Sequence, residues 1–150
     1  FHSYKRFANV FLPNQKFYSD YAHHPTEIKE TIKALKESSP QKKLAVIFQP
    51  HQLERLNFLF EDFVESFDGC DRLILLPAYQ VAGRETIDGK NSKDLFENIK
   101  KSRKIPDIHY LINLAGAIKI IKQFSNSVIV FMGAGDIDNE VRRYFKSRLF

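Results

Sequence analysis

The chain has 150 residues, a length that suits one domain with a sizeable hydrophobic core. Hydrophobic residues make up 43% and charged residues 27%, and no apolar run approaches the roughly 20 residues that a membrane-spanning helix needs. The single cysteine, Cys70, excludes an internal disulfide framework and is typical of a reducing compartment. We therefore expect a cytoplasmic protein without a membrane partner, and one that belongs to a longer chain because the sequence begins without Met.

The net charge of +5 weakly favours anionic partners such as phosphates. The densest basic run, residues 100–104, has no interleaved aromatic residues. Nucleic-acid-binding segments usually combine both features, so we interpret the run as a solvated helix end and expect no nucleic-acid partner.

The first third of the chain indicates two extended segments within residues 7–20, a helix and a buried strand. The helix begins at Pro25, a residue favoured at the first helical position, and His24 directly precedes it. Its apolar stripe follows the helical period at Ile28, Ile32 and Leu35. The short apolar run at residues 43–48 is typical of a strand in a parallel sheet.

The middle of the chain predicts one helix whose apolar stripe runs from Leu56 to Phe67 and which ends before Gly69. A strand at residues 72–79 follows, and then a loop at residues 80–91 that is longer than packing alone requires. Ser92 is predicted to cap the next helix, which extends to about Arg103.

The last third predicts a modest strand at residues 107–111, a helix capped by Asn113, a strand from residue 127 into a glycine turn, and a final helix capped by Asp136. Strands that alternate with helices indicate a mostly parallel sheet covered on both faces. The fold class is therefore α/β, a Rossmann-like open sheet in a single domain at residues 1–150.

The stretch "YSDYAHHPTEI", residues 18–28, is the first candidate site. A metal site needs ligands that converge on one point, whereas the adjacent His23 and His24 point apart in an extended turn. Asp20 ends a strand just before a helix, where α/β folds place polar binding groups. A functional role for Asp20 and one histidine, and a purely structural turn in which a histidine caps the helix, both remain open; of the two, His24 fits the cap and His23 the ligand side.

The second candidate site, "FQPHQLER" at residues 48–55, lies at the next strand-to-helix junction. If the two strands are neighbours, His51 and Arg55 face the same crevice as His23. Arg55 follows His51 by one helical turn and could hold a carboxylate or phosphate with two hydrogen bonds. The alternative is a surface arginine, but the start of a helix is where a positive charge is least favourable.

The glycine turn at residues 133–136, "GAGD", lacks the third glycine of the dinucleotide fingerprint and lies late in the chain. A tight turn that needs small residues and a direct phosphate contact are equally good interpretations. The sequence contains no phosphate loop of the Gly-x-x-x-x-Gly-Lys type and no nucleophile motif of the Gly-x-Ser-x-Gly type.

Four stretches together resemble the C-terminal domain of the Mur ligase family. They are "SYKRF" at residues 3–7, "DYAHHPTEI" at 20–28, "FQPH" at 48–51 followed by Arg55, and "MGAGDI" at 132–137. The loop "AGRETIDGKNS" is similar to the family's Ala-Gly-Glu loop, with Gly89 and Ser92 kept. The resemblance spans nearly the whole chain and is strongest to the branch that joins L-alanine to UDP-N-acetylmuramate in peptidoglycan synthesis.

The resemblance implies that two further domains, for the UDP-sugar and for ATP with Mg²⁺, are absent from this chain. ATP phosphorylates the substrate carboxylate, and the amine of L-alanine then displaces phosphate. By position, Asp20 and Tyr21 match residues that meet the nucleotide and the reaction centre, His23 lines the same crevice, and Arg6 matches a basic residue near the nucleotide. The resemblance places His51 and Arg55 near the L-alanine carboxylate. It implies no catalytic residue and no metal site within this chain alone, which we expect to be inactive by itself.

The sequence departs from the family pattern after His51, where Gln52 replaces the first of two arginines and Glu54 replaces a small hydroxyl residue. These changes put in doubt the phosphate or carboxylate contact that the family's first arginine would make, and they leave the amino-acid preference open. Two alternatives to the L-alanine branch are the recycling branch, which adds a tripeptide to the same UDP-sugar, and a free-standing nucleotide-binding module.

Overall fold

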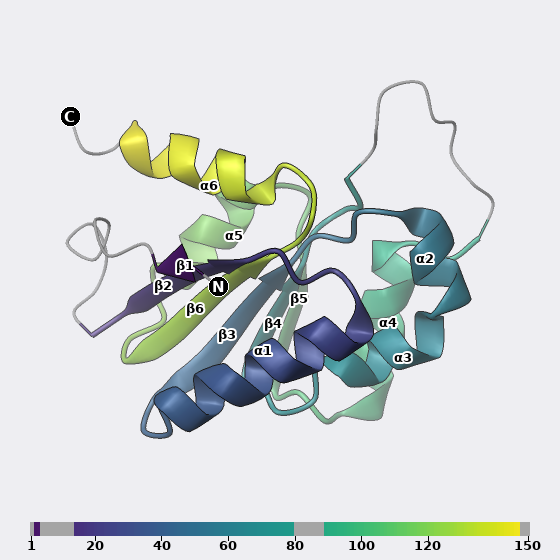
Figure 1. Cartoon of the computed structure of the whole chain (residues 1–150), viewed down its shortest axis with the longest axis horizontal. Coiled ribbons are helices and arrows are strands. Elements are labelled where there is room, and N and C mark those ends of the chain that lie inside the picture. Colours follow the sequence, from purple (N-terminus) through teal and green to yellow (C-terminus); the bar gives the residue numbers. More distant parts are fainter. Residues whose placement is uncertain (1, 4–13, 80–88, 148–150) are drawn as a thin grey trace.

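The structure, a computed structural model, describes residues 2–3, 14–79 and 89–147 (Figure 1). Among these residues, six strands form one sheet in the order β1-β2-β6-β3-β4-β5. The strands are β1 (His2–Ser3), β2 (Lys16–Asp20), β3 (Lys43–Phe48), β4 (Arg72–Leu75), β5 (Asp107–Tyr110) and β6 (Ser127–Met132). Only the pair β1–β2 is antiparallel, so the predicted mostly parallel sheet is confirmed.

Helices cover both faces of the sheet, as predicted. The helices are α1 (Pro25–Ser38), α2 (Leu53–Phe58), α3 (Phe60–Ser66), α4 (Ser92–Ser102), α5 (Leu114–Ile121) and α6 (Ile137–Lys146). The first four pack on one face, and α5 and α6 pack on the other (Figure 1). None of the described helices is both long and apolar enough to span a bilayer.

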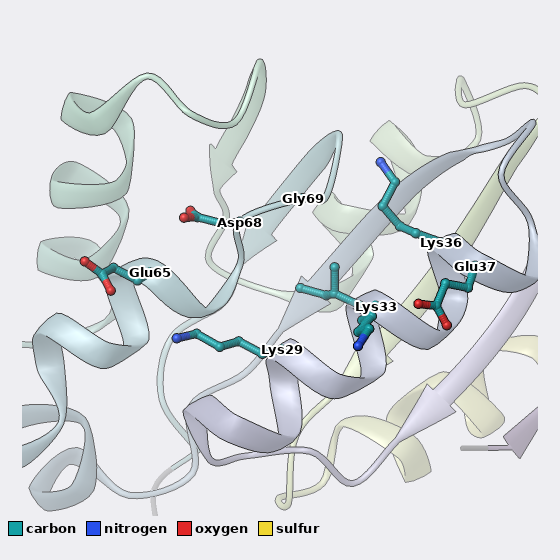
Figure 2. A pocket seen from close by; sticks show the side chains of 8 residues that line it. Lys29, Lys33, Lys36, Glu37, Glu65, Asp68 and Gly69 are labelled. Carbon is teal, nitrogen blue, oxygen red and sulfur yellow. The ribbon is translucent and has the colours of Figure 1, made fainter.

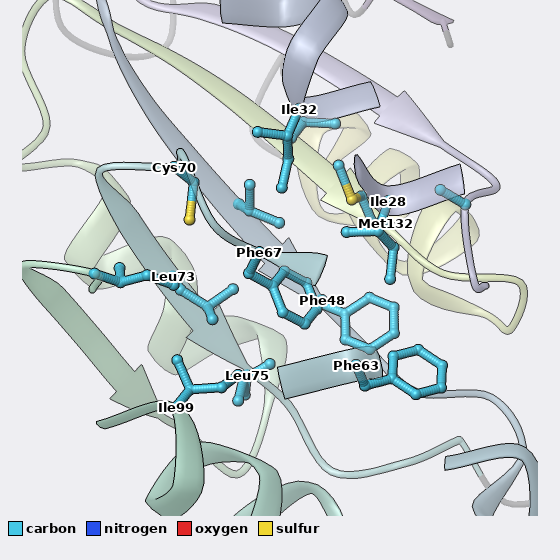
Figure 3. Packing of buried hydrophobic residues seen from close by; sticks show 14 of the residues in the cluster. Ile28, Ile32, Phe48, Phe63, Phe67, Cys70, Leu73, Leu75, Ile99 and Met132 are labelled. Atoms are coloured by element: carbon cyan, nitrogen blue, oxygen red, sulfur yellow. The ribbon is translucent and has the colours of Figure 1, made fainter. Parts of the chain in front are cut away.

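The strands divide their side chains between two cores, because successive residues of a strand point to opposite faces. In β3, Val46 and Phe48 enter the core under α1, α3 and α4, whereas Ile47 enters the core under α5 and α6. Phe48 lies at the centre of the first core, where its ring centroid is 5.1 Å from that of Phe67 and 6.0 Å from that of Phe63 (Figure 3). Strands buried on both faces explain why residues 43–48 are almost uniformly apolar.

The helix predicted from the stripe Leu56–Phe67 is two helices, because the chain kinks at Leu59, where φ is −109° and ψ is 26°. The periodic apolar residues Leu56, Phe60 and Phe63 are nevertheless buried, as the period predicts. Periodicity identifies the face that turns to the core but carries no information about the direction of the axis. Gly69, with φ of 99°, follows α3 as predicted.

Helix capping was predicted well at two helices and wrongly at one. The Nδ1 atom of His24 accepts a hydrogen bond from Thr26 N at 3.3 Å, and Glu27 bonds back to His24 N, so His24 is the N-cap of α1. Asn113 caps α5 as expected. At α4 the cap is Asn91; Ser92 is the first helical residue, and its buried hydroxyl donates to Leu76 O at 2.6 Å.

Three smaller differences concern element ends. Asp136 is the N-cap residue of α6, but its carboxylate binds Arg143 at 2.8 Å and makes no cap hydrogen bond. The strand predicted at residues 72–79 ends at Leu75, with one further backbone bond from Leu76 N to Phe48 O at 3.0 Å. Residues 7–13 of the predicted extended segments lie outside the described residues, and the short β1 was not predicted.

Candidate functional site

The candidate site lies at the edge of the sheet where the parallel strands end. The last residues of β2, β6 and β3 are in register, since Asp20 and Phe48 both pair with Met132. Backbone bonds continue past this line, from Gly133 N to Asp20 O at 3.2 Å and from Gln49 N to Met132 O at 3.0 Å. In open α/β sheets this edge is the usual ligand-binding crevice.

Asp20 is half-buried and positions the start of the segment that leads to α1. Its Oδ1 atom accepts a hydrogen bond from Ala22 N at 2.7 Å, and its Oδ2 atom accepts one from the hydroxyl of the buried Thr31 at 3.0 Å. These bonds lock the turn between β2 and α1. The carboxylate therefore has a structural role in addition to any role toward a ligand.

Tyr21 and His23 lie close to Asp20, Tyr21 exposed and His23 partly buried. The Tyr21 side chain is 69% exposed, which is unusual for so large an aromatic residue. The His23 ring packs edge-on against it with centroids 5.2 Å apart, and its Nδ1 atom lies 2.9 Å from Tyr21 O. The prediction that His24 caps the helix is confirmed. The prediction that His23 faces a ligand stays a prediction, and His23 is not among the residues that line the pocket beside Asp20.

His51 and Arg55 lie on the same edge as His23 but not on the neighbouring strand. The sequence argument assumed that β2 and β3 are neighbours, whereas β6 lies between them. The edge therefore has two parts, one at Asp20–His23 and one at His51–Arg55. The turn after β6 separates them.

Arg55 is half-buried on α2, and its guanidinium makes no hydrogen bond or ion pair with the residues that the structure describes. The argument that a positive charge is unfavourable at a helix start loses its force here. Because α2 has six residues, Arg55 lies in its last turn as well as near its start. A partly desolvated guanidinium without a partner remains suited to a carboxylate or phosphate.

The turn after β6 lies between the two parts, and packing explains each of its glycines. Gly133 has a φ of 157°, and a Cβ atom there would lie 2.9 Å from Gln49 O. A Cβ atom on Gly135 would lie 2.7 Å from Cγ of Tyr79. Of the two interpretations of "GAGD", the structure favours a tight turn that needs small residues.

A pocket of about 300 Å³ opens beside this turn. Its lining residues are Ser19, Asp20, Tyr21, Gly133, Gly135, Asp138 and Asn139. The charged residues among them are carboxylates, which repel phosphate, so this pocket does not fit the triphosphate of ATP. Within residues 2–3, 14–79 and 89–147, no three His, Cys, Asp or Glu side chains are grouped to hold a metal ion such as Mg²⁺.

A larger cavity of about 430 Å³ lies between α1 and α3, away from this edge (Figure 2). Lys29, Lys33 and Lys36 line it from α1, and Glu65 and Asp68 line it from the opposite side. Its charges largely compensate each other, and Asp68 is also bound by Lys104 at 3.1 Å. Gly69, which precedes β4, belongs to its wall, so the cavity lies toward the starts of the strands rather than their ends.

Among the ionisable groups of the described residues, two depart from their ordinary pKa. Burial, with a smaller contribution from Asp71, raises the pKa of the Cys70 thiol to about 12. Partial burial, followed by repulsion from Asp136, raises the pKa of Glu140 on α6. A thiol with so high a pKa is almost wholly protonated at neutral pH, which makes Cys70 a packing residue and not a nucleophile.

Tyr79 belongs to the site, although the sequence analysis placed it only at the end of a strand. Its ring stacks on His51 with centroids 5.4 Å apart and planes 10° from parallel. Gln49 was also missed; its Oε1 atom is buried without a partner among the described residues. The sequence contained one signal for these contacts. Glycines at residues 133 and 135 indicate that other groups approach the backbone closely there, but they do not identify which residues those are.

Two predictions fall on residues that the structure leaves undescribed. Arg6 lies within residues 4–13, and most of the loop at 80–91 lies within residues 80–88. The end of that loop is described, however. Asn57 donates to Lys90 O at 2.8 Å and accepts from Lys90 N at 2.7 Å, which fixes the loop end to α2.

The sequence from residue 5 to residue 135 matches the family described as "Mur ligase, glutamate ligase domain". The chain belongs to this family. A UDP-N-acetylmuramate–L-alanine ligase of Levilactobacillus brevis is 36% identical over 93% of this chain and 30% of its own length. The enzyme of the same name from Hydrogenobaculum is 37% identical over 87% and 28%. The chain thus spans less than a third of these Mur ligases.

Solved structures agree with the Mur ligase assignment. The UDP-N-acetylmuramate–alanine ligase of Thermotoga maritima superposes with a TM-score of 0.69 at 26% identity, over 99% of this chain and 28% of that one. A domain from a putative UDP-N-acetylmuramate:L-alanyl-gamma-D-glutamyl-diaminopimelate ligase of Haemophilus ducreyi has a TM-score of 0.61 at 19% identity, over 89% of this chain and 91% of that one. That second likeness concerns the fold alone, and it involves a domain that was crystallised separately.

Proposed function

We propose that this Mur ligase domain binds the incoming amino acid in an ATP-dependent ligase that joins L-alanine to UDP-N-acetylmuramate. The observation that carries the proposal is Arg55, a half-buried guanidinium without a partner among the described residues, one turn beyond His51. Relatives that are 36% and 37% identical bear the name of this ligase, which supports the choice of substrates.

The chemistry of amide formation explains why such a group is useful. A free amino acid must be held by its carboxylate so that its amine points at the activated carbonyl carbon. A guanidinium binds a carboxylate with two charge-assisted hydrogen bonds and so fixes its orientation. On this proposal the amine attacks the acyl phosphate, the new C–N bond forms, and phosphate leaves.

ATP and Mg²⁺ are assigned to other parts of the longer protein. The charged side chains that line the pocket beside Asp20 are the carboxylates of Asp20 and Asp138, and the sequence contains no phosphate loop. We propose that this chain is the C-terminal domain of a three-domain enzyme of the bacterial cytoplasm. Asp20, Tyr21 and His23, with Arg6, then form the side that faces the nucleotide and the reaction centre. The chain alone should release no ADP from ATP when both other substrates are present.

The test of the proposal is the Arg55→Ala substitution in the full-length enzyme. Loss of the charge-assisted bond should raise the KM for L-alanine by a factor corresponding to about 1.5–3 kcal/mol, and leave the KM for ATP unchanged. Lys101→Ala, at an exposed position of α4, is the matched control because it removes the same charge far from the site. An unchanged KM for L-alanine in Arg55→Ala would refute the role of Arg55.

The recycling reaction, which adds a tripeptide to the same UDP-sugar, is the second candidate. It is distinguished by measuring phosphate release with L-alanine, with the tripeptide, and with a panel of other amino acids. Preference for the tripeptide would replace the present proposal. The panel also tests whether Gln52 and Glu54 alter the choice of amino acid. A free-standing nucleotide-binding module would instead bind ATP as the isolated chain, which calorimetry would detect.

A further inference from the structure

Tyr79 lies where three separate segments of the chain meet. It follows β4 after a short extended stretch, and its backbone N donates to Pro50 O at 2.7 Å, which ties it to the segment between β3 and α2. Its ring stacks on His51 from that same segment, with centroids 5.4 Å apart. On another side the ring approaches Gly135, in the turn between β6 and α6, so closely that no Cβ atom fits between them.

The backbone bond and the two ring contacts together fix the ring plane of Tyr79. Stacked rings whose planes are within 10° of parallel hold each other against rotation. His51 is therefore oriented by a residue that is distant in sequence and itself half-buried. Tyr21, another tyrosine at this edge, is 69% exposed and packs edge-on against His23 instead.

We propose that Tyr79 is a positioning residue for the amino-acid part of the site, because it holds the imidazole of His51 and requires glycine at position 135. This inference rests on the proposed function, in which His51 and Arg55 face the amino acid. The role needs the aromatic ring and not the hydroxyl group. On this inference, position 135 requires glycine because the Tyr79 ring leaves no room for a Cβ atom, and not because a phosphate group binds there.

The first measurement does not depend on any activity. In an NMR spectrum of the chain, the imidazole protons of His51 should be shielded by the ring current of Tyr79. Tyr79→Leu should abolish this shielding and Tyr79→Phe should retain it, since only leucine removes the stack. Thermal unfolding of each variant shows whether it is folded, and the separately crystallised Haemophilus ducreyi domain shows that such domains fold alone.

The second measurement uses the full-length enzyme. Tyr79→Leu should raise the KM for L-alanine by about twofold to tenfold, the range expected for the loss of an aromatic pair, while the KM for ATP stays constant. Tyr79→Phe should restore the wild-type value. If Tyr79→Leu does not fold, Gly135→Ala replaces it, because the added methyl group would displace the ring from the other side.

The outcomes separate the inference from the proposed function. A raised KM with leucine that phenylalanine restores supports the inference. A shifted His51 signal with an unchanged KM for L-alanine overturns it, and so does an equal rise with phenylalanine and leucine, which would mean that the hydroxyl touches the substrate. If Arg55→Ala raises the KM but Tyr79→Leu does not, only the inference fails. If neither raises it, the proposed function fails as well.

Discussion

Asp20 allows a sharp test of whether a predicted site residue is structural, functional or both. Its carboxylate accepts hydrogen bonds from Ala22 N at 2.7 Å and from the Thr31 hydroxyl at 3.0 Å. Bonds to a charged group contribute about 1.5–3 kcal/mol each when buried, and Asp20 is half-buried. Asp20→Ala also leaves the buried Thr31 hydroxyl without this acceptor, so we expect a loss of about 2–3 kcal/mol in the free energy of unfolding.

Urea unfolding followed by circular dichroism measures this loss, because the chain contains no tryptophan for fluorescence. Asp20→Asn should cost only about 1 kcal/mol, since its amide oxygen can still accept one bond and the Thr31 hydroxyl can turn to accept from the amide. Thr31→Val removes the hydroxyl that donates to Asp20 but keeps the bond from Ala22 N, so its loss of stability should lie between those of Asp20→Asn and Asp20→Ala. If Asp20→Ala unfolds within about 0.5 kcal/mol of the unmodified chain, the structural argument is wrong.

Comparing Asp20→Ala with Asp20→Asn also tests whether the carboxylate of Asp20 takes part in the reaction. Asp20→Asn keeps most of the structure and removes the charge, so its kinetics in the full-length enzyme report on the carboxylate itself. A large fall in kcat with normal stability would place the charge at the reaction centre, as the family resemblance implies. Normal kinetics would leave Asp20 with its structural role only.

The remaining predictions concern the loop anchor and two ionisable groups. Asn57→Ala should lower the free energy of unfolding by about 1–2 kcal/mol, because Asn57 makes two hydrogen bonds with Lys90. The methyl group of Gly89→Ala would lie 2.5 Å from Asn57 Oδ1, so Gly89→Ala should cost less stability in the Asn57→Ala variant than in the unmodified chain. Additive losses in a double-mutant cycle would contradict this contact between residues 57 and 89. Cys70 in the folded chain at pH 8 should react with an aromatic disulfide reagent on the order of 100-fold more slowly than in urea, and rapid labelling would disprove its burial. The pKa of Glu140 is raised in the folded state, by burial first and then by Asp136, so its contribution to stability is present below its ordinary pKa of 4.5 and is lost as the pH rises through the folded value. Glu140→Gln should therefore stabilise the chain at pH 7, by less than about 1 kcal/mol for so exposed a group, with no gain at pH 3; equal gains at both pH values would show another cause.

Local patterns predicted the parts of this fold that depend on neighbours in sequence. The stripe of Ile28, Ile32 and Leu35 and the cap at His24 depend only on residues close in sequence, and both are confirmed. The apolar run at 43–48 predicted a buried strand because both of its faces enter a core. The strand-to-helix junctions supplied Asp20, His23, His51 and Arg55 as candidates, and the family resemblance added Tyr21 and Arg6.

Other features depend on contacts between distant segments and were missed for that reason. No local signal states that β6 lies between β2 and β3, so the condition of neighbouring strands, under which His51 and Arg55 would share a crevice with His23, is not met. The stack of Tyr79 on His51 joins the segment after β4 to the segment after β3, and the turn after β6 packs against Tyr79 at Gly135. The kink at Leu59 occurs within an uninterrupted helical period, next to Asn57, whose amide is engaged with Lys90.

The position of β6 between β2 and β3 also affects the order in which the strands of the sheet can pair during folding. β6 is the last described strand to leave the ribosome, yet both of its neighbours, β2 and β3, are made much earlier. Lys16 must pair with Val128, more than a hundred positions away, and such distant pairings form slowly because a long loop must close first. Until residues 127–132 arrive, β2 lacks its parallel partner and the apolar edge of β3 stays uncovered. β2 and β3 can therefore pair with β6 only after residues 127–132 have been synthesised, and the candidate binding edge forms only when β6 joins the sheet.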